Sequence, residues 1–410
     1  GFQEKRKVCV KMEESIFYTK NRKKLANRLE NGTAAILFAG CAPYKRGDEV
    51  YPFSVDRNFY YVTGVEEENC IFLMTKQHDQ VQETLYIPRD NGPLAKWVGE
   101  TISPQEAEKI SGMAQISYVD LFRQDLADTI LRQGLTKVAL DLENRDWQAA
   151  PVTGVSFALE VKQQYPAMEL VDLYPVFGDL RLIKEDWEIK RLEKAMEITR
   201  LGLENLIRHT KPGMKEYEAE AYFDFTLMQH GAREKAFATI VAAGRRGTIL
   251  HYHKNTETIQ AGDLVLVDCG AQYKWYNGDI TRTFPANGKF SPRQKQVYDI
   301  VLEGQKRVMD AIRPGVPFAR LNEILKEYYL EALKELGLAQ TMEDVSRYYY
   351  HGVSHYLGAE THDIGRYIAR DLAEGMVLTV EPGLYIEEWG IGIRTEDDVL
   401  VTKDGCRNLT

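Results

Sequence analysis

The sequence predicts two domains, an α/β domain followed by an α+β domain that is duplicated within itself. The chain has 410 residues, which is more than one hydrophobic core usually serves. Apolar runs of strand length alternate with helical spacing as far as about residue 175, whereas the order helix, Pro-Gly, helix, strands occurs twice beyond it. We therefore expect an N-terminal domain over residues 1–175 and a C-terminal domain over residues 176–410.

The alternation in the first part of the chain locates the elements of the N-terminal domain. Strands are predicted at residues 34–39, 70–75 and 137–142, and helices at residues 21–29 and 156–164. Strands that alternate with helices favour an α/β domain with a partly parallel sheet. Residues 1–11 precede Met12, and an extension upstream of the protein proper explains them as well as a native N-terminus does.

The C-terminal domain contains an internal repeat. The tetrapeptide Lys-Pro-Gly-Met at 211–214 recurs as Arg-Pro-Gly-Val at 313–316, and each copy lies between two predicted helices, at 185–210 and 215–230, then at 292–312 and 317–336. Pro-Gly ends a helix because Pro cannot continue it and Gly tolerates positive φ. Apolar, strand-forming segments follow each helix pair. We therefore expect two related halves whose sheets meet, with a site that takes its ligands from both.

Composition excludes several classes of partner. The chain carries 61 acidic and 52 basic residues, for a formal charge of −9, which argues against nucleic acid or an anionic membrane surface as the main partner. No apolar run approaches the roughly 20 residues needed to span a bilayer. The five cysteines are odd in number, scattered and without metal-ligand spacing. We therefore expect a reduced, cytoplasmic setting, with Cys269 a packed residue.

Five residues of the C-terminal domain point to a metal site. Four are carboxylates and one is an imidazole, and each borders an apolar or glycine-punctuated segment: Asp268, Asp279, His355, Glu381 and Glu396. Taken alone, each acid is more typical of a turn, and 396–398 of a solvated acidic turn. A carboxylate at the end of a buried strand is costly without a compensating charge. Two divalent ions would neutralise four such groups and leave a bound hydroxide as the nucleophile.

Local patterns suggest how these groups meet. Residues 270–278 are turn-rich and 280–284 form a predicted strand, so a hairpin-like connection can bring Asp268 beside Asp279. Strand alternation places Arg394 with Glu396 on one face. Alternation likewise places Glu381 with Tyr385 on one face, and His251 with His253 on a shared strand face.

Histidines cluster near the acids. Five of the eight lie in two groups, at 251 and 253, then at 351, 355 and 362. His351 and His355 are four residues apart, but Gly352 and Gly358 make a loop more probable than a helix, and the segment lacks the glutamate of the HExxH zinc motif. A site with mostly oxygen ligands and one nitrogen suits Mn²⁺ or Mg²⁺ better than zinc.

With these flanks, the five residues resemble the pita-bread metallopeptidases, and within them the aminopeptidase P family, to which prolidase is the nearest relative. The segments that carry the resemblance are 249–252, 278–284, 351–358, 380–385 and 392–398, together with 58–65 in the N-terminal domain. The resemblance covers roughly residues 15–405. It implies the pita-bread fold for the C-terminal domain and, for the N-terminal domain, a part in oligomerisation and substrate gating.

The resemblance also implies a ligand set. Asp268 is expected to chelate one metal ion, and Asp279 and Glu396 to bridge both. His355 and Glu381 are expected to complete the coordination of the other. The ions are expected to be Mn²⁺, with Co²⁺ or Zn²⁺ as alternatives, and a water or hydroxide between them would be the nucleophile. Glu381 is the expected acceptor of its proton.

Further roles follow from the same resemblance. His251 and His362 are expected to polarise the scissile carbonyl and stabilise the tetrahedral intermediate. His351 is expected to border the pocket for proline. Arg394 and Tyr385 are expected to support the ligands. His253 has no counterpart in the family, so we expect a surface or packing residue.

Three positions leave alternatives open. Trp97 matches a tryptophan that reaches a neighbouring subunit's site in the family, but an ordinary core tryptophan has the same pattern. Asn58 stands where the family often has Asp, which puts an acid–arginine contact between subunits in doubt. Arg245 and Arg246 are either a solvated pair or a bias towards acidic peptides.

The expected function is that of a dinuclear aminopeptidase that hydrolyses the first peptide bond of X-Pro peptides. An X-Pro amide has no N–H, so a protease that reads that donor gains nothing from it. A prolidase restricted to X-Pro dipeptides is the first alternative, and a pita-bread binding protein without catalysis the second. The expected partners are a peptide with proline in second position and further copies of the chain, as a homodimer or homotetramer.

Overall fold

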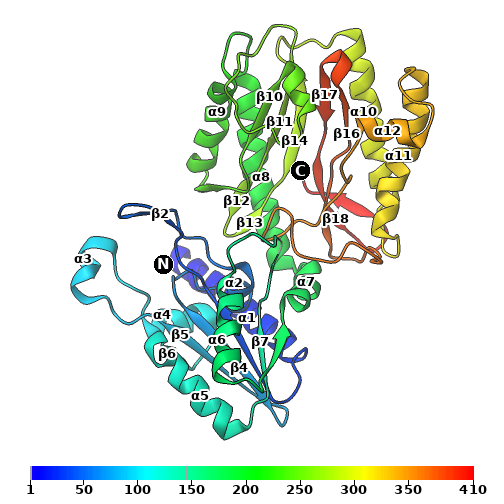
Figure 1. Cartoon of the computed structure of the whole chain (residues 1–410). Helices are drawn as coiled ribbons and strands as arrows, with labels where there is room; N and C mark the ends of the chain where they lie inside the picture. Colours follow the sequence, from blue (N-terminus) through cyan, green and yellow to red (C-terminus); the bar gives the residue numbers. More distant parts are fainter. Residues whose placement is uncertain (1, 145) are drawn as a thin grey trace. The chain divides into compact units, whose positions relative to one another are not determined.

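The computed structural model describes residues 2–144 and 146–410, with side chains from residue 14 onward. The suggested extension at 1–11 therefore lies outside the described side chains. The chain divides into two compact units, Gly1–Leu180 and Arg181–Thr410 (Figure 1). The boundary expected at 175 falls inside helix α7 (Tyr174–Leu182). Within the described part of the chain, no helix combines the length and apolarity required to span a bilayer.

The N-terminal unit is built on a six-stranded sheet in the order β6-β5-β4-β1-β7-β8. β1 pairs with β4 antiparallel and with β7 parallel, so the sheet is mixed, as predicted. The bounds are β1 (Thr33–Phe38), β4 (Ile71–Gln77), β5 (Gln80–Ile87), β6 (Ile116–Tyr118), β7 (Lys137–Leu140) and β8 (Glu169–Asp172); β2 (Tyr44–Arg46) and β3 (Glu49–Val50) form a separate hairpin.

Helices accompany this sheet, and all but the short helix at 95–98 contribute buried side chains to the core. They are α1 (Phe2–Ala26), α2 (Arg57–Thr63), α3 (Ala95–Val98), α4 (Pro104–Ser111), α5 (Phe122–Gln133) and α6 (Thr153–Gln164). The helix expected at 21–29 begins at Phe2 and ends at Ala26. The prediction was therefore wrong for residues 27–29 and for the start of the helix. Buried Arg22 explains the packing of α1, because its guanidinium donates to the carbonyls of Val62 and Ser111 and to Glu83.

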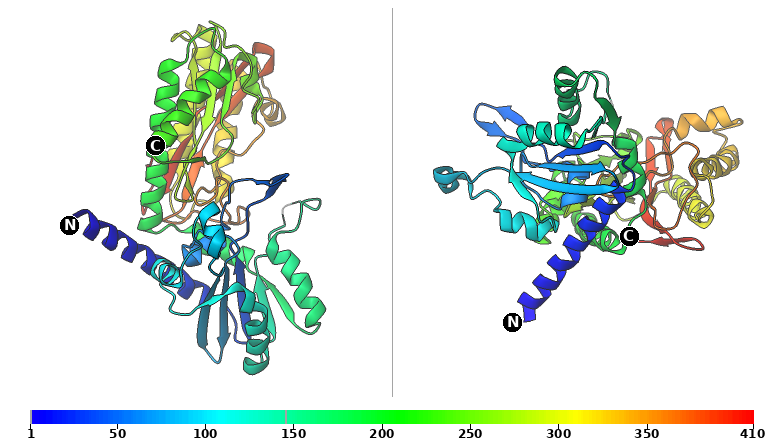
Figure 2. Two further views of the ribbon diagram at one scale, coloured as in Figure 1. Left: turned by 90° about the vertical axis from the view of Figure 1, so that its left-hand side faces the viewer. Right: turned by 90° about the horizontal axis from the view of Figure 1, so that it is seen from below.

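The C-terminal unit places its strands between two helix pairs, as Figures 1 and 2 show. α8 contacts β11–β14 and α10 contacts β15–β17. The helices are α8 (Asp186–His209), α9 (Glu216–Gln229), α10 (Pro292–Ala311), α11 (Phe318–Glu335) and α12 (Met342–Tyr348). The strands are β9 (Glu234–Lys235), β10 (Ile240–Ala243), β11 (Leu264–Cys269), β12 (Ala271–Tyr273), β13 (Tyr276–Asn277), β14 (Ile280–Pro285), β15 (Val377–Val380), β16 (Gly383–Ile386), β17 (Ile391–Arg394), β18 (Asp397–Val401) and β19 (Cys406–Asn408).

The two halves of this unit close their helix pairs in the same way. Gly213, at φ 93°, donates its N–H to the carbonyl of Ile259, which in turn donates to Met214. In the second half, Gly315, at φ 85°, donates to Leu372, which donates to Val316. Glycine is required at both turns because L side chains disfavour this region of φ. The Pro-Gly repeat of the sequence is thus a repeat of backbone hydrogen bonding.

The duplication extends to the strands that carry the acids. In the first half, β10-β11-β14 form one antiparallel sheet, and in the second, β15 pairs antiparallel with β18. Asp268 lies at the end of β11 and Glu381 directly after β15, while Asp279 and Glu396 directly precede β14 and β18. The four acids therefore occupy two pairs of equivalent places, at one end of each hairpin-like pair of strands.

Candidate metal centre

The first half contributes two acids through paired strands. In the register of β11 and β14, Asp268 faces Thr281 and Cys269 faces Ile280. Asp279 precedes β14 by one residue, so antiparallel pairing brings it to the same end of the sheet as Asp268, as the sequence suggested. The intervening residues form β12 and β13 rather than a simple turn. The N–H of Asp279 donates to Oδ2 of Asp398 at 3.0 Å, which fixes its backbone.

In the second half, residues 353–355 pair with the end of β15 and the residue after it, and this pairing holds both His355 and Glu381. The N–H of Glu381 donates to the carbonyl of Val353 at 2.8 Å, and that of Thr379 donates to His355 at 3.0 Å. Nε2 of His355 lies 3.4 Å from Oε1 of Glu381 and 3.5 Å from Oδ2 of Asp279. Its Nδ1 lies 2.9 Å from the carbonyl of Tyr356, so the Nε2 lone pair is free to face a metal ion.

Glu396 joins the two halves. Its N–H donates to the carbonyl of Thr281 at 3.0 Å, and the Thr281 hydroxyl donates to its Oε2 at 2.6 Å. These contacts fix Glu396 beside the sheet of the first half. One ligand atom each from Asp279, His355 and Glu396 lie within 4.8 Å of one another. Such a trio can share one divalent ion.

The electrostatics of the cluster favour added positive charge, as protons or as cations. Burial raises the pKa of Asp279 and of Glu396 well above the ordinary carboxyl value, and repulsion from neighbouring carboxylates adds to it. Burial likewise raises the pKa of Glu381, partly offset by His355 and Arg394. Among the described residues, Oδ1 of Asp268 is buried with no hydrogen-bond partner. Oxygen-rich sites with one imidazole suit divalent cations such as Mn²⁺, so the residues present fit the expected metal pair.

Arg394 and Tyr385 form a chain of hydrogen bonds beside the acids. Arg394 donates from Nη2 to Oδ2 of Asp268 at 2.6 Å and from Nη1 to the hydroxyl of Tyr385 at 3.1 Å. That hydroxyl lies 2.8 Å from Nε2 of His351, whose Nδ1 lies 2.7 Å from the carbonyl of Gly352. Burial lowers the pKa of His351 to about 4. The neutral ring therefore accepts a hydrogen bond from the Tyr385 hydroxyl. Asp268, Arg394, Tyr385 and His351 thus form one hydrogen-bonded chain.

The other three histidines singled out in the sequence, His251, His253 and His362, are exposed. The ring of His362 packs against His355 with centroids 4.3 Å apart. His251 and His253 stack at 6.0 Å, but they lie in a loop after the 3-10 helix Gly244–Thr248. The predicted strand at this place is therefore wrong, although the two rings do share one side of the chain. His253 is exposed, which agrees with a surface residue.

The arginine pair of this segment has local partners. Arg246 donates through Nε to buried Glu216 at 2.9 Å, and Arg245 pairs with Glu387. Arg246 is thus a structural residue rather than a solvated one, while Arg245 and Glu387 are both mainly exposed.

In the N-terminal unit, the structure gives the surroundings of two of the positions left open. Trp97 on α3 is 86% exposed, so it is not a core tryptophan of this unit. Asn58 on α2 is buried, and its amide donates to Oδ2 of Asp141 at 2.6 Å.

Cys269, in β11 of the C-terminal unit, is buried, and burial raises its thiol pKa, which agrees with a packed, unreactive residue.

Sequence reasoning missed the part played by Asp397 and Asp398, which follow the predicted ligand Glu396. All three side chains are buried, not solvated as a surface turn would be. Arg282 donates to the carbonyl of Glu396 and to Oδ1 of Asp397, and Asp398 receives the N–H of Asp279. The available signal was Arg282, the one charged residue of β14 (Ile280–Pro285). Glu216, described below, gave no signal beyond its place at a helix start.

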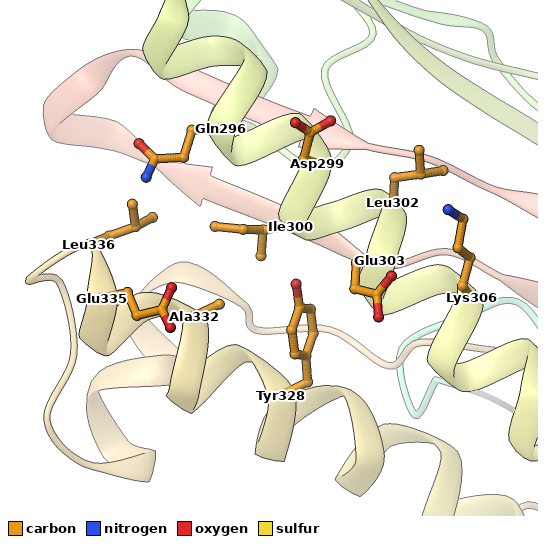
Figure 3. Close-up of a pocket in the computed structure, with 10 residues that line it drawn as sticks. All are labelled: Gln296, Asp299, Ile300, Leu302, Glu303, Lys306, Tyr328, Ala332, Glu335 and Leu336. Carbon is orange, nitrogen blue, oxygen red and sulfur yellow. The ribbon is translucent and has the colours of Figure 1, made fainter.

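A groove of about 490 Å³ between α10 and α11 is separate from this cluster. Figure 3 shows Tyr328 of α11 pointing towards α10, where Asp299 and Glu303 border the groove. These acids pair with neighbours on their own helix, Lys295 and Arg307. The charges of Asp299 and Glu303 are therefore compensated within α10.

Comparison with known proteins places the chain. Residues 190–403 match the model of metallopeptidase family M24, and residues 18–138 match that of the aminopeptidase P N-terminal domain. The chain is 34% identical to an Xaa-Pro aminopeptidase of Escherichia coli, over 96% of the chain and 94% of that protein. The chain is a member of the aminopeptidase P family of M24 metallopeptidases.

Solved structures of the aminopeptidase P family support the same assignment. A Bacillus anthracis protein assigned as aminopeptidase P is 49% identical, with a TM-score of 0.95 over 97% of this chain and 94% of that one. A zinc-substituted E. coli aminopeptidase P in complex with product is 33% identical, with a TM-score of 0.87 over 97% and 94%. The predicted fold class, an α/β domain followed by a pita-bread domain, is confirmed.

Proposed function

We propose that this member of the aminopeptidase P family is a dinuclear metal-dependent aminopeptidase that releases the N-terminal residue from X-Pro peptides. The convergence of Asp268, Asp279, His355, Glu381 and Glu396 at one end of the duplicated sheets carries the proposal. The buried, unpartnered oxygen of Asp268 and the raised carboxyl pKa values support it. The names of the relatives, Xaa-Pro aminopeptidase and aminopeptidase P, agree with this activity.

The ligands divide into two groups by position. Asp268 would hold one ion, while His355 and Glu381, with Nε2 and Oε1 3.4 Å apart, would hold the other. Asp279 and Glu396 would contact both. Divalent ions bound there would lower the pKa of a water molecule and polarise the scissile carbonyl. We infer Mn²⁺, with Co²⁺ or Zn²⁺ as alternatives, because the set is rich in carboxylate oxygen.

The other residues of the site have separate tasks. Glu381 accepts the proton of the attacking water, because its carboxylate belongs to the ligand group and burial raises its pKa. His251 and His362 donate to the carbonyl oxygen as negative charge develops on it. His351, uncharged at neutral pH because its pKa is about 4, presents an uncharged ring edge to the proline ring.

We further propose a homodimer or homotetramer in the cytoplasm. Leu94, Trp97 and Val98 are 62%, 86% and 79% exposed around α3. An exposed apolar cluster of this kind is typical of an interaction surface, and a second copy of the chain is the expected occupant. In this assignment the N-terminal unit contributes oligomerisation and limits the length of the substrate. Free cysteines at 41, 70, 269 and 406 are consistent with a reduced compartment.

The experiment that tests the activity compares an X-Pro dipeptide with an X-Pro-X tripeptide. We expect turnover of the tripeptide that is lost on chelation and restored by Mn²⁺. Glu381→Ala is expected to abolish turnover, while Glu374→Ala, which removes an exposed acid on the same segment, leaves it intact. Cleavage of the dipeptide alone would establish a prolidase. No turnover of either peptide by the metal-loaded protein would establish a binding protein without catalysis.

A further inference from the structure

Glu216, in the first turn of α9, is fully buried and accepts four hydrogen bonds. Oε1 accepts from the N–H of Ala243 and from Nε of Arg246, both at 2.9 Å. Oε2 accepts from the hydroxyl of Tyr252 at 2.8 Å and from the N–H of Glu257 at 3.0 Å. A buried carboxylate without partners would be very costly. Here each of the two carboxylate oxygens of Glu216 accepts two hydrogen bonds.

The four donors span one continuous segment. Ala243 ends β10, Arg246 lies in the 3-10 helix that follows, and Glu257 precedes the return of the chain towards β11. His251 lies between these donors. A single side chain from a different helix therefore ties both ends and the middle of the loop that carries His251.

The Tyr252 hydroxyl sets the direction of its neighbours. Tyr252 is 7% exposed, whereas His251 and His253 on either side are exposed and stacked on each other. In extended chain, successive side chains point to opposite sides. Holding Tyr252 inward therefore holds His251 outward. The start of this loop borders the candidate site, because the Tyr350 hydroxyl donates to the carbonyl of Thr248 at 3.0 Å and the Tyr350 ring packs against Tyr385 at 5.4 Å between centroids.

We propose that Glu216 is a positioning residue for His251, acting through Tyr252 and the backbone of the 243–257 loop. The inference rests on the proposed function, in which His251 donates to the scissile carbonyl. Glu216 itself contacts neither substrate nor metal. Its task is to keep the imidazole at one place, since a displacement of about 1 Å in a catalytic group can cost about 100-fold in rate.

The test uses Glu216→Gln in the full-length, metal-loaded protein, with Glu218→Gln as control. Glu218 lies in the same helix turn, is exposed, and accepts from the N–H of Lys215 rather than from the loop. We expect Glu216→Gln to retain its metal content, to speed amide exchange at Ala243 and Glu257, and to lower kcat for an X-Pro tripeptide about tenfold or more. Glu218→Gln is expected to change none of these. Tyr252→Phe, which removes one donor alone, serves if Glu216→Gln does not fold.

A double-mutant cycle separates positioning from general stability. With His251→Ala already present, Glu216→Gln or Tyr252→Phe should lower kcat less than about twofold, because the residue being positioned is gone. The proposal is wrong if the loss of kcat in the double variant is the full product of the losses in the two single variants. It is also wrong if Glu216→Gln leaves amide exchange in the loop unchanged. If His251→Ala alone leaves turnover intact while Glu216→Gln still loosens the loop, the anchor stands and the carbonyl role of His251 falls.

Discussion

Arg394 donates from Nη2 to Oδ2 of Asp268 over 2.6 Å, while Oδ1 of the same carboxylate is buried with no partner among the described residues. One oxygen is thus bound by a fixed cation and the other is left for an exchangeable one. Because Arg394 also donates to Tyr385, which contacts His351, the same guanidinium links an expected metal ligand, Asp268, to the expected proline pocket.

Replacing Arg394 by Ala is expected to lower kcat by about 10- to 100-fold at saturating metal, because Asp268 loses the partner that orients it. Tyr385→Phe should have a smaller effect on kcat and a larger one on KM, since it frees His351 but leaves Asp268 bound. Steady-state kinetics on an X-Pro tripeptide, with metal content measured in parallel, check both variants. Equal kcat in Arg394→Ala and the unmodified protein would contradict the orienting role.

The stability conferred by metal should grow as pH rises. Burial and repulsion raise the folded-state pKa values of Asp279 and Glu396 above the unfolded value of about 4. The metal-free fold therefore holds more protons than the unfolded chain from about pH 4 upward, and these groups make it less stable as pH rises through their raised pKa values. Bound cations compensate the ionised carboxylates and remove this loss.

Thermal unfolding with Mn²⁺ and with a chelator, at about pH 5 and at about pH 7.5, measures this effect. The difference in Tm between the two forms is expected to be larger at the higher pH. Proton release on metal binding, measured by calorimetry in two buffers, should be positive at neutral pH. A difference in Tm that narrows as pH rises would exclude the cluster as the metal site.

The grouping of these acids could be predicted because Asp268 and Glu381 follow features that a linear pattern records. Asp268 and Glu381 each close an apolar run, and the Pro-Gly repeat marks both halves. Such signals are local, so they survive without knowledge of the fold. The same reasoning correctly indicated the mixed sheet of the N-terminal unit.

What escaped prediction depends on contacts between distant segments. Residues 397 and 398 resemble a solvated turn, yet both are buried. Arg282 donates to Asp397 and the N–H of Asp279 donates to Asp398. The loop at His251 has the alternation of a strand, but its two ends are held by Glu216, which accepts the N–H groups of Ala243 and Glu257. Helix α1 ends at Ala26, and its Arg22 donates to the carbonyls of Val62 and Ser111, contacts with distant segments that no local pattern records.

Asp363 is expected to stabilise the segment that carries His355 and His362. Its carboxylate is buried between Arg181 and Lys184, whose side chains are 3% and 1% exposed. Burial alone would raise the pKa of Asp363, but these two charges outweigh it and lower the pKa. Asp363→Asn leaves two buried cations poorly compensated and should cost about 3–5 kcal/mol. Glu360→Gln, at a partly exposed partner of Arg181, should cost about 1 kcal/mol or less.

Urea unfolding at neutral and acid pH tests this assignment. Because the folded pKa of Asp363 is depressed, its contribution is present above the unfolded pKa of about 4 and is lost as pH falls through the folded value. The difference in unfolding free energy between the unmodified protein and Asp363→Asn should therefore shrink in acid. A difference that stays constant with pH would show that charge pairing is not its source.

Two glycines at one contact should respond unequally to substitution by alanine. A β-carbon at Gly392, in β17, would lie 1.9 Å from the carbonyl oxygen of Gly247, whereas one at Gly247 would lie 3.2 Å from the carbonyl oxygen of Gly392. Gly392→Ala must displace backbone, and overpacking of this kind costs about 1–3 kcal/mol. β17 ends at Arg394 and Gly247 precedes the loop of His251, so Gly392→Ala should also reduce kcat.

Thermal unfolding and steady-state kinetics of the two variants provide the comparison. Gly247→Ala is the matched control, because it adds the same methyl group at the other side of the same contact and neither glycine has a positive φ. We expect Gly392→Ala to lose clearly more stability and more activity than Gly247→Ala. Equal losses would mean that the close approach of these two backbones does not position Arg394 and His251, and that the loop is held by Glu216 and its four donors alone.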